Sequence, residues 1–186
     1  MSWQPEIDEL QRRRTLAEAC GGPEAVARHH AQGKLTVRER VAALADPGSF
    51  REVGKLAGKA SYDAAGQLKT FEPAPYVMGL ARINGRPVAI GGEDYTIRAG
   101  TGFGSDRRKG GQGGFIEDLA YEYRIPLINL IDGTGGTVNT AKRKGYTVVP
   151  GYGQDGIERS VELLGQVPVV SAVMGTTAGG PSMRAI

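Results

Sequence analysis

Apolar residues recur at helical spacing along the first fifty residues of the chain. The spacing over residues 5–31 predicts a helical segment that Gly21-Gly22-Pro23 interrupts. A further helix is predicted to begin at Thr36, because Glu39 follows three residues later in the pattern of a capping box. We therefore expect residues 1–50 to form an N-terminal helical arm.

Between residues 76 and 96 the apolar pattern changes from helical spacing to a period of two. Asn84-Gly85 lies between two strand-like runs in this region, and this dipeptide is the strongest short-range signal for a β-hairpin. The preceding residues, 54–75, are polar and contain Gly and Pro, so a surface loop is expected there.

Helix-like and strand-like segments alternate in the second half of the chain. Helical spacing covers residues 113–124 and 155–165. A mainly apolar run at 126–131 is typical of a strand covered on both faces, and a second apolar run at 167–173 also predicts a strand. This alternation predicts an α/β domain over residues 51–186. The second helix is expected to turn an apolar face inward, which consists of Ile157, Val161 and Leu164.

Composition narrows the functional classes. Hydrophobic residues make up 40% of the chain and charged residues 23%, which is typical of a folded globular protein. The net charge of +3 is too small to indicate a nucleic-acid partner. Cys20 is the only cysteine, so neither an internal disulfide nor a cysteine-based zinc site is expected, and His29-His30 lacks further ligands at metal spacing. No secretory signal or membrane-spanning run is visible, so we expect a cytoplasmic location and no membrane or metal.

Two of the predicted apolar strands run directly into glycine-rich segments. One strand ends in Asp132 and continues into 133–136, and the other continues into 175–180. Ligands of α/β sheets bind beyond the carboxyl ends of the strands, where glycine lets backbone N–H groups approach a ligand oxygen. A helix starting at Pro181 would place the amides of Gly179 and Gly180 at its positive end, which predicts an oxyanion site. The alternative is that the glycines only turn a strand into a helix.

Four long segments carry a resemblance to a known family. "GKLTVRERVAALADPGSF", "GLARINGRPVAIGGEDYTIRAGT", "EDLAYEYRIPLINLIDGTGG" and "VPVVSAVMGTTAGG" resemble carboxyltransferase (beta) subunits of biotin-dependent acyl-CoA carboxylases, such as propionyl- and methylcrotonyl-CoA carboxylase. The resemblance covers about residues 30–186. It implies a crotonase-like (ClpP/crotonase) spiral of ββα units, incomplete at the C-terminus. The chain looks like the N-terminal, acyl-CoA-binding domain of such a subunit.

The resemblance also implies a reaction and its site. Carboxyltransferases of this family move a carboxyl group from carboxybiotin to an acyl-CoA, through an enolate held by backbone amides. The catalytic Gly-Gly pair of the family falls on Gly179 and Gly180, and the glycines that line the acyl-CoA channel fall on Gly135 and Gly136. Common members read D-S-G-G-A-R where this chain has Asp132-Gly-Thr-Gly-Gly-Thr137, so the acyl group accepted is left open.

Basic residues suggest contacts to coenzyme A. Arg107, Arg108 and Lys109 precede a glycine-rich segment and could bind the CoA phosphates, although a solvated basic loop explains them as well. Arg38 and Arg40 lie in the predicted helix after Thr36. They either help to position CoA or form surface or interface pairs.

The resemblance implies partners as well. They are an acyl-CoA, a carrier protein bearing carboxybiotin, a biotin carboxylase subunit, and further copies of the chain in an oligomer built from dimers, such as a hexamer. The chain alone is then expected to be inactive. Three alternatives stay open: a biotin-dependent acyl-CoA decarboxylase of the same fold, a non-catalytic CoA-thioester-binding or assembly module, and a generic nucleotide-binding α/β domain. The last is weakly supported, because neither the P-loop pattern nor the dinucleotide fingerprint occurs at either strand end.

Overall fold

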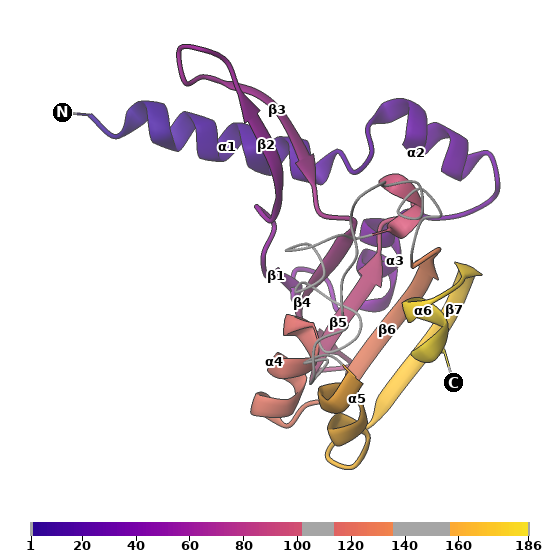
Figure 1. The fold of residues 1–186 in the computed structure, drawn as a ribbon. Coiled ribbons are helices and arrows are strands. Elements are labelled where there is room, and N and C mark those ends of the chain that lie inside the picture. Colours follow the sequence, from indigo (N-terminus) through magenta and orange to yellow (C-terminus); the bar gives the residue numbers. More distant parts are fainter. Residues whose placement is uncertain (1, 102–113, 136–156, 186) are drawn as a thin grey trace, which may run out of the picture.

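The structure is a computed structural model that describes residues 2–101, 114–135 and 157–185. Figure 1 shows a twisted sheet with helices on both faces and a long helix lying beside a separate hairpin. None of the helices in these described ranges combines the length and the apolar character needed to cross a membrane. The division of the chain at residue 50 stays a prediction.

Three helices precede the sheet, as the apolar spacing predicted. Helix α1 covers Gln4–Glu18, α2 covers Pro23–His30 and α3 covers Val37–Leu44. The capping box is present in full, since the Thr36 hydroxyl accepts from the Glu39 amide while the Glu39 carboxylate accepts from the Thr36 amide. These reciprocal bonds fix where α3 begins.

The expected surface loop over residues 54–75 is wrong, because this segment forms an antiparallel hairpin. Strand β2 covers Gly58–Tyr62 and β3 covers Leu68–Pro73. Asp63 closes the turn, since its carboxylate accepts from two backbone amides within the next four residues, each at 2.9 Å. Leu68 and Phe71 pack with Ala17 of α1, so the hairpin buries an apolar face that its polar composition conceals.

The main sheet has five strands in the order β1-β4-β5-β6-β7. The first three pair antiparallel, and β5, β6 and β7 are parallel. The predicted hairpin at Asn84-Gly85 is confirmed, and both turn residues have positive φ, 50° and 77°. The strands cover Arg51–Glu52 (β1), Tyr76–Ile83 (β4), Arg86–Glu93 (β5), Leu127–Gly133 (β6) and Val169–Thr177 (β7).

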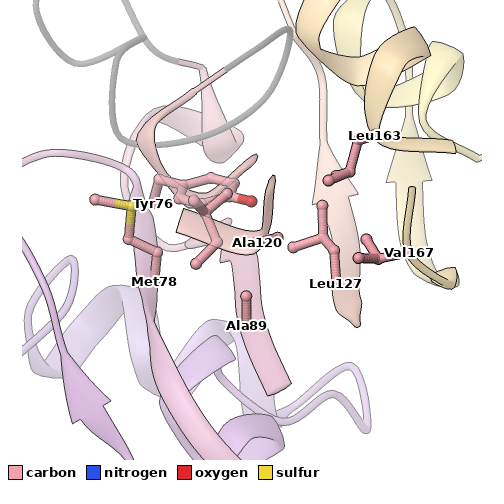
Figure 2. Close-up of a cluster of buried hydrophobic side chains, with 8 residues drawn as sticks. Tyr76, Met78, Ala89, Ala120, Leu127, Leu163 and Val167 are labelled. Atoms are coloured by element: carbon pink, nitrogen blue, oxygen red, sulfur yellow. The ribbon is translucent and has the colours of Figure 1, made fainter. Parts of the chain in front are cut away.

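Each face of the sheet has its own apolar cluster. Helix α3 covers one face, where Val41 packs among strand residues such as Ile90 and Leu130. Helices α4 (Phe115–Tyr123) and α5 (Ile157–Leu164) cover the other face. Figure 2 shows the labelled side chains of this second cluster, which are Tyr76, Met78, Ala89, Ala120, Leu127, Leu163 and Val167.

The predicted inward face of α5 is wrong at two positions. Val161 and Leu164 are 62% and 66% exposed, whereas Leu163 is buried against Leu127 and Val167. The helix is therefore rotated so that Val161 and Leu164 line an open cavity of about 400 Å³, together with Met183 and residues of β6 and β7. The side chain of Ile157 lies outside the described residues.

Candidate functional site

The two predicted glycine segments begin side by side at the carboxyl edge of the sheet. Gly133 at the end of β6 pairs with Thr177 at the end of β7. The Ala178 amide then donates a hydrogen bond of 3.2 Å to the Gly133 carbonyl, which extends the contact beyond the ladder. Parallel strands bring their carboxyl ends to one edge, so loops more than forty residues apart in sequence meet here.

Gly135 makes the closest approach between the two loops. A Cβ built on Gly135 would lie 2.3 Å from the Ala178 carbonyl oxygen and 3.0 Å from the Gly180 amide nitrogen. The φ of Gly135 is +70°, which disfavours a side chain even without these contacts. Only glycine fits this position, and its backbone lies directly against the Gly179–Gly180 segment.

The Gly179–Gly180 segment presents backbone donors. Gly179 has φ 62° and ψ −131°, a conformation that glycine adopts far more readily than other residues, and the short helix α6 (Gly180–Met183) follows it. Ser182 holds the turn, because its amide and its hydroxyl both donate to the Gly179 carbonyl, at 3.1 and 2.6 Å. Within the described ranges, the amides of Gly179 and Gly180 donate no hydrogen bond, so they are available to an acceptor.

The other predicted site residues cannot be placed in the same way. Gly136 and the basic cluster Arg107, Arg108 and Lys109 lie outside the described residues. Their proposed contacts to acyl-CoA and to its phosphates stay predictions.

A buried ion pair lies under the glycine segments on the α3 face of the sheet. Asp132 is fully buried, and its Oδ2 accepts from the Arg40 guanidinium at 2.8 Å. The Lys34 ammonium lies 3.7 Å from the other carboxylate oxygen. Gly175 makes room for this carboxylate, since a Cβ there would lie 2.0 Å from Asp132 Oδ1. Arg40 is therefore buried and paired, which excludes both a surface pair and a direct CoA contact in this structure.

A second buried ion pair lies on the opposite, α4 face. Glu93 at the end of β5 pairs with Arg184, which directly follows α6. Glu93 Oε2 also accepts from the Asp132 amide at 3.2 Å. The Arg184 guanidinium lies 3.5 Å from the Tyr76 hydroxyl, and burial raises the pKa of this phenol, so Tyr76 stays neutral at physiological pH.

The sequence interpretation missed both pairs. The sequence offered only a weak signal for them, because Glu93 and Asp132 are charged residues at the ends of mainly apolar strands. The other cation predicted to contact CoA, Arg38, forms two hydrogen bonds with Glu52 at 2.8 and 2.9 Å. In the described part of the chain, no group of three or more His, Cys, Asp or Glu side chains could hold a metal ion.

The amides of Gly179 and Gly180 are suited to stabilising a negative charge that develops on a bound oxygen. The carboxylates of Asp132 and Glu93 are already paired with arginines, so they are poorly suited to act as nucleophiles. The carboxyl transferase domain family matches residues 28–184, and the chain belongs to this family.

Relatives and solved structures agree with this assignment. The chain is 33% identical to the propionyl-CoA carboxylase beta chain of Cereibacter sphaeroides over 174 residues, which are 94% of this chain and 32% of that one. It is 32% identical to the methylmalonyl-CoA carboxyltransferase 12S subunit of Propionibacterium freudenreichii subsp. shermanii, over 95% of this chain and 32% of the relative. The chain thus spans about a third of the length of the curated relatives it matches.

The solved structures confirm the expected α/β, crotonase-like fold. A transcarboxylase 12S hexamer with bound methylmalonyl-coenzyme A superposes with a TM-score of 0.66 at 25% identity, covering 99% of this chain and 34% of that one. A single-chain, multi-domain long-chain acyl-CoA carboxylase superposes with a TM-score of 0.74 at 29% identity, covering 97% and 18%.

Proposed function

We propose that the chain is the acyl-CoA-binding part of a biotin-dependent carboxyltransferase, which moves a carboxyl group from carboxybiotin to an acyl-CoA. The observation that carries this proposal is the close approach of Gly135 to the Gly179–Gly180 segment. Within the described residues, the amides of Gly179 and Gly180 in this segment have no acceptor. Family membership and the printed activities of the relatives support the reaction class.

The amides act on the thioester carbonyl. When the α-carbon of an acyl-CoA loses its proton, the electron pair moves onto the carbonyl oxygen and an enolate forms. The Gly179 and Gly180 amides donate to this oxygen, and such donors bind the enolate more strongly than the neutral carbonyl. Loss of one oxyanion donor typically lowers the rate about 10²- to 10³-fold.

The carboxyl donor comes from outside the described residues. Carboxybiotin on a carrier protein would supply the carboxyl group as CO2, and its ureido nitrogen would take the α-proton. The enolate carbon then forms the new bond to CO2. A carrier, a biotin carboxylase subunit and a dimer-built oligomer are the proposed partners, and the hexamer of the 12S transcarboxylase supports the oligomer.

A second candidate is a CoA-thioester-binding or assembly module without carboxyl transfer of its own. The observation that favours it is that the Gly179 and Gly180 amides would hold a thioester oxygen equally well in a bound ligand that does not react. A decarboxylase of the same fold uses the same enolate and the same amides, so the site supports it equally.

Calorimetry with the 186-residue chain tests the binding part of the proposal. Propionyl-CoA is expected to bind and to be preferred over ATP and NAD. Tighter binding of NAD or ATP would reject the proposal in favour of a nucleotide-binding domain.

Exchange of the acyl-CoA α-proton with solvent tests the amide donors. In the carboxyltransferase assembled with its carrier, Gly180→Val is expected to lower the exchange rate by about 100-fold or more, because a branched side chain crowds the oxyanion position. Gly165→Val is the matched control, since its Cβ would meet only a carbonyl oxygen 3.6 Å away. An active assembly in which Gly180→Val exchanges as fast as Gly165→Val would contradict the assigned role. Binding without carboxyl transfer in the wild-type assembly would favour the binding module.

A further inference from the structure

One carboxylate connects both glycine segments of the candidate site. Glu93 binds the Arg184 guanidinium through one oxygen and the Asp132 amide through the other, at 3.2 Å. Asp132 lies three residues before Gly135, and Arg184 lies four residues after Gly180. We infer that Glu93 is a positioning residue that sets the distance and orientation between the two segments, and thereby aims the Gly179 and Gly180 amides. This inference deepens the proposed function and its catalytic part rests on it.

The carboxylate of Glu93 is buried together with its partner. The side chains of Glu93 and Arg184 are 4% and 7% exposed, so solvent screens their attraction little. Gly133 leaves the space for Glu93, because a Cβ on that glycine would lie 2.7 Å from Glu93 Cγ. A greater separation of β5 and β6 at this point would break the hydrogen bond from the Asp132 amide to Glu93. The geometry therefore ties the position of β6 to the position of Glu93.

On the strands β4 and β5, Glu93 is the charged partner of Arg184. Tyr76 on the neighbouring strand offers only a neutral hydroxyl at 3.5 Å, and Glu117 on α4 adds a second negative charge near the guanidinium. Removal of the Glu93 charge leaves Arg184 buried without its main counter-charge. Since Arg184 directly follows α6, the turn at Gly179 is then expected to shift.

The first experiment does not depend on catalysis. Amide hydrogen exchange of Ala178 and Thr134 is measured by NMR, because their bonds to Gly133 (3.2 Å) and to Ala99 (3.0 Å) hold the two segments in place. Glu93→Gln is expected to accelerate both exchange rates about tenfold or more under conditions where the chain stays folded. Arg184→Lys, which keeps the charge but loses the planar fork, is expected to act in the same direction.

Glu52→Gln is the matched control. Its carboxylate also binds an arginine, Arg38, through two hydrogen bonds and is 6% exposed, but it lies away from the glycine segments on β1. This change is expected to leave exchange of Ala178 and Thr134 unaltered once the change in global stability is subtracted. Equal acceleration in the two glutamine variants, or none in Glu93→Gln and Arg184→Lys, would overturn the positioning role.

The second experiment measures α-proton exchange of propionyl-CoA in the assembled carboxyltransferase. Glu93→Gln is expected to lower kcat about 10- to 100-fold with KM changed less than threefold, because displaced amides weaken enolate binding more than substrate binding. The double variant Glu93→Gln/Arg184→Gln restores a neutral hydrogen-bonded pair and is expected to regain part of kcat. An unchanged kcat in Glu93→Gln would overturn the catalytic part. A wild-type assembly without exchange would instead refute the proposed function, while the NMR result still decides the structural part.

Discussion

Replacing Gly135 with alanine is expected to destabilise the chain much more than the same replacement at Gly66. The two glycines have similar backbone conformations, with φ of +70° and +77°, so the strain of a left-handed alanine is about 1 kcal/mol at each. At Gly66 a Cβ meets nothing within 4 Å. At Gly135 it would lie 2.3 Å from the Ala178 carbonyl oxygen and 2.8 Å from Pro181 Cδ. Overpacking of this kind adds about 1–3 kcal/mol.

The loss of unfolding free energy is therefore expected to be about 1 kcal/mol for Gly66→Ala and about 2–4 kcal/mol for Gly135→Ala. Urea unfolding followed by circular dichroism measures both values, and unchanged slopes show that the comparison concerns the folded state. Because the backbone strain is shared, the difference between the variants reports the contact between the two glycine segments. Losses that agree within about 0.5 kcal/mol would refute this contact, and with it the geometry on which the oxyanion site depends.

Three further predictions concern the side chains of Asp132, Cys20 and Glu39. Asp132→Asn is expected to lower the unfolding free energy by about 3 kcal/mol, because Arg40 keeps a buried charge without its partner, and a loss below about 1 kcal/mol would contradict this. Burial raises the pKa of the Cys20 thiol to about 12, so iodoacetamide at pH 8 should alkylate the folded chain at least about 100-fold more slowly than the urea-unfolded chain; similar rates would show an accessible thiolate. The hydrogen bond from His30 lowers the pKa of Glu39 from 4.5 to about 2, so its stabilisation is complete above pH 4.5 and is lost as the pH falls towards 2. His30→Ala should reduce this loss in urea titrations between pH 5 and 2, modestly because both side chains are half-exposed, and an identical pH dependence would refute the assignment.

Local signals in the sequence predicted much of the fold. The capping box at Thr36 and the hairpin turn at Asn84-Gly85 each depend on residues within four positions of one another, and the structure contains both. The apolar runs that became β6 and β7 were also recognisable as strands, and β6 is buried as expected for a strand covered on both faces. No residue of β7 is buried, and Val170 and Val173 are more than half exposed. Fold class follows from such elements once their order along the chain is known.

Features that depend on distant partners could not be predicted. The β2–β3 hairpin looks polar, since its apolar face is only completed by Ala17 of α1. The orientation of α5 depends on which side chain reaches Leu127, and Leu163 does so instead of its apolar neighbours. The ion pair between Arg40 and Asp132 joins residues 92 positions apart, so no spacing rule relates them.

The glycines at the strand ends have two separate physical causes, and this distinction decides which of them can touch a substrate. The sequence alone left open whether they serve a ligand or only turn a strand into a helix. In the structure, Gly133 and Gly175 face the carboxylates of Glu93 and Asp132, and any side chain there would overlap a buried ion pair. Gly179 has no such neighbour, because a Cβ on it would approach other atoms no closer than 3.8 Å. Its backbone conformation, rather than a protein side chain, requires glycine, and the proposed function assigns the amides that this conformation presents to a thioester oxygen. Buried charges therefore explain the glycines at the strand ends, and of these three only Gly179, whose conformation is not explained by a neighbour, belongs to the proposed oxyanion site.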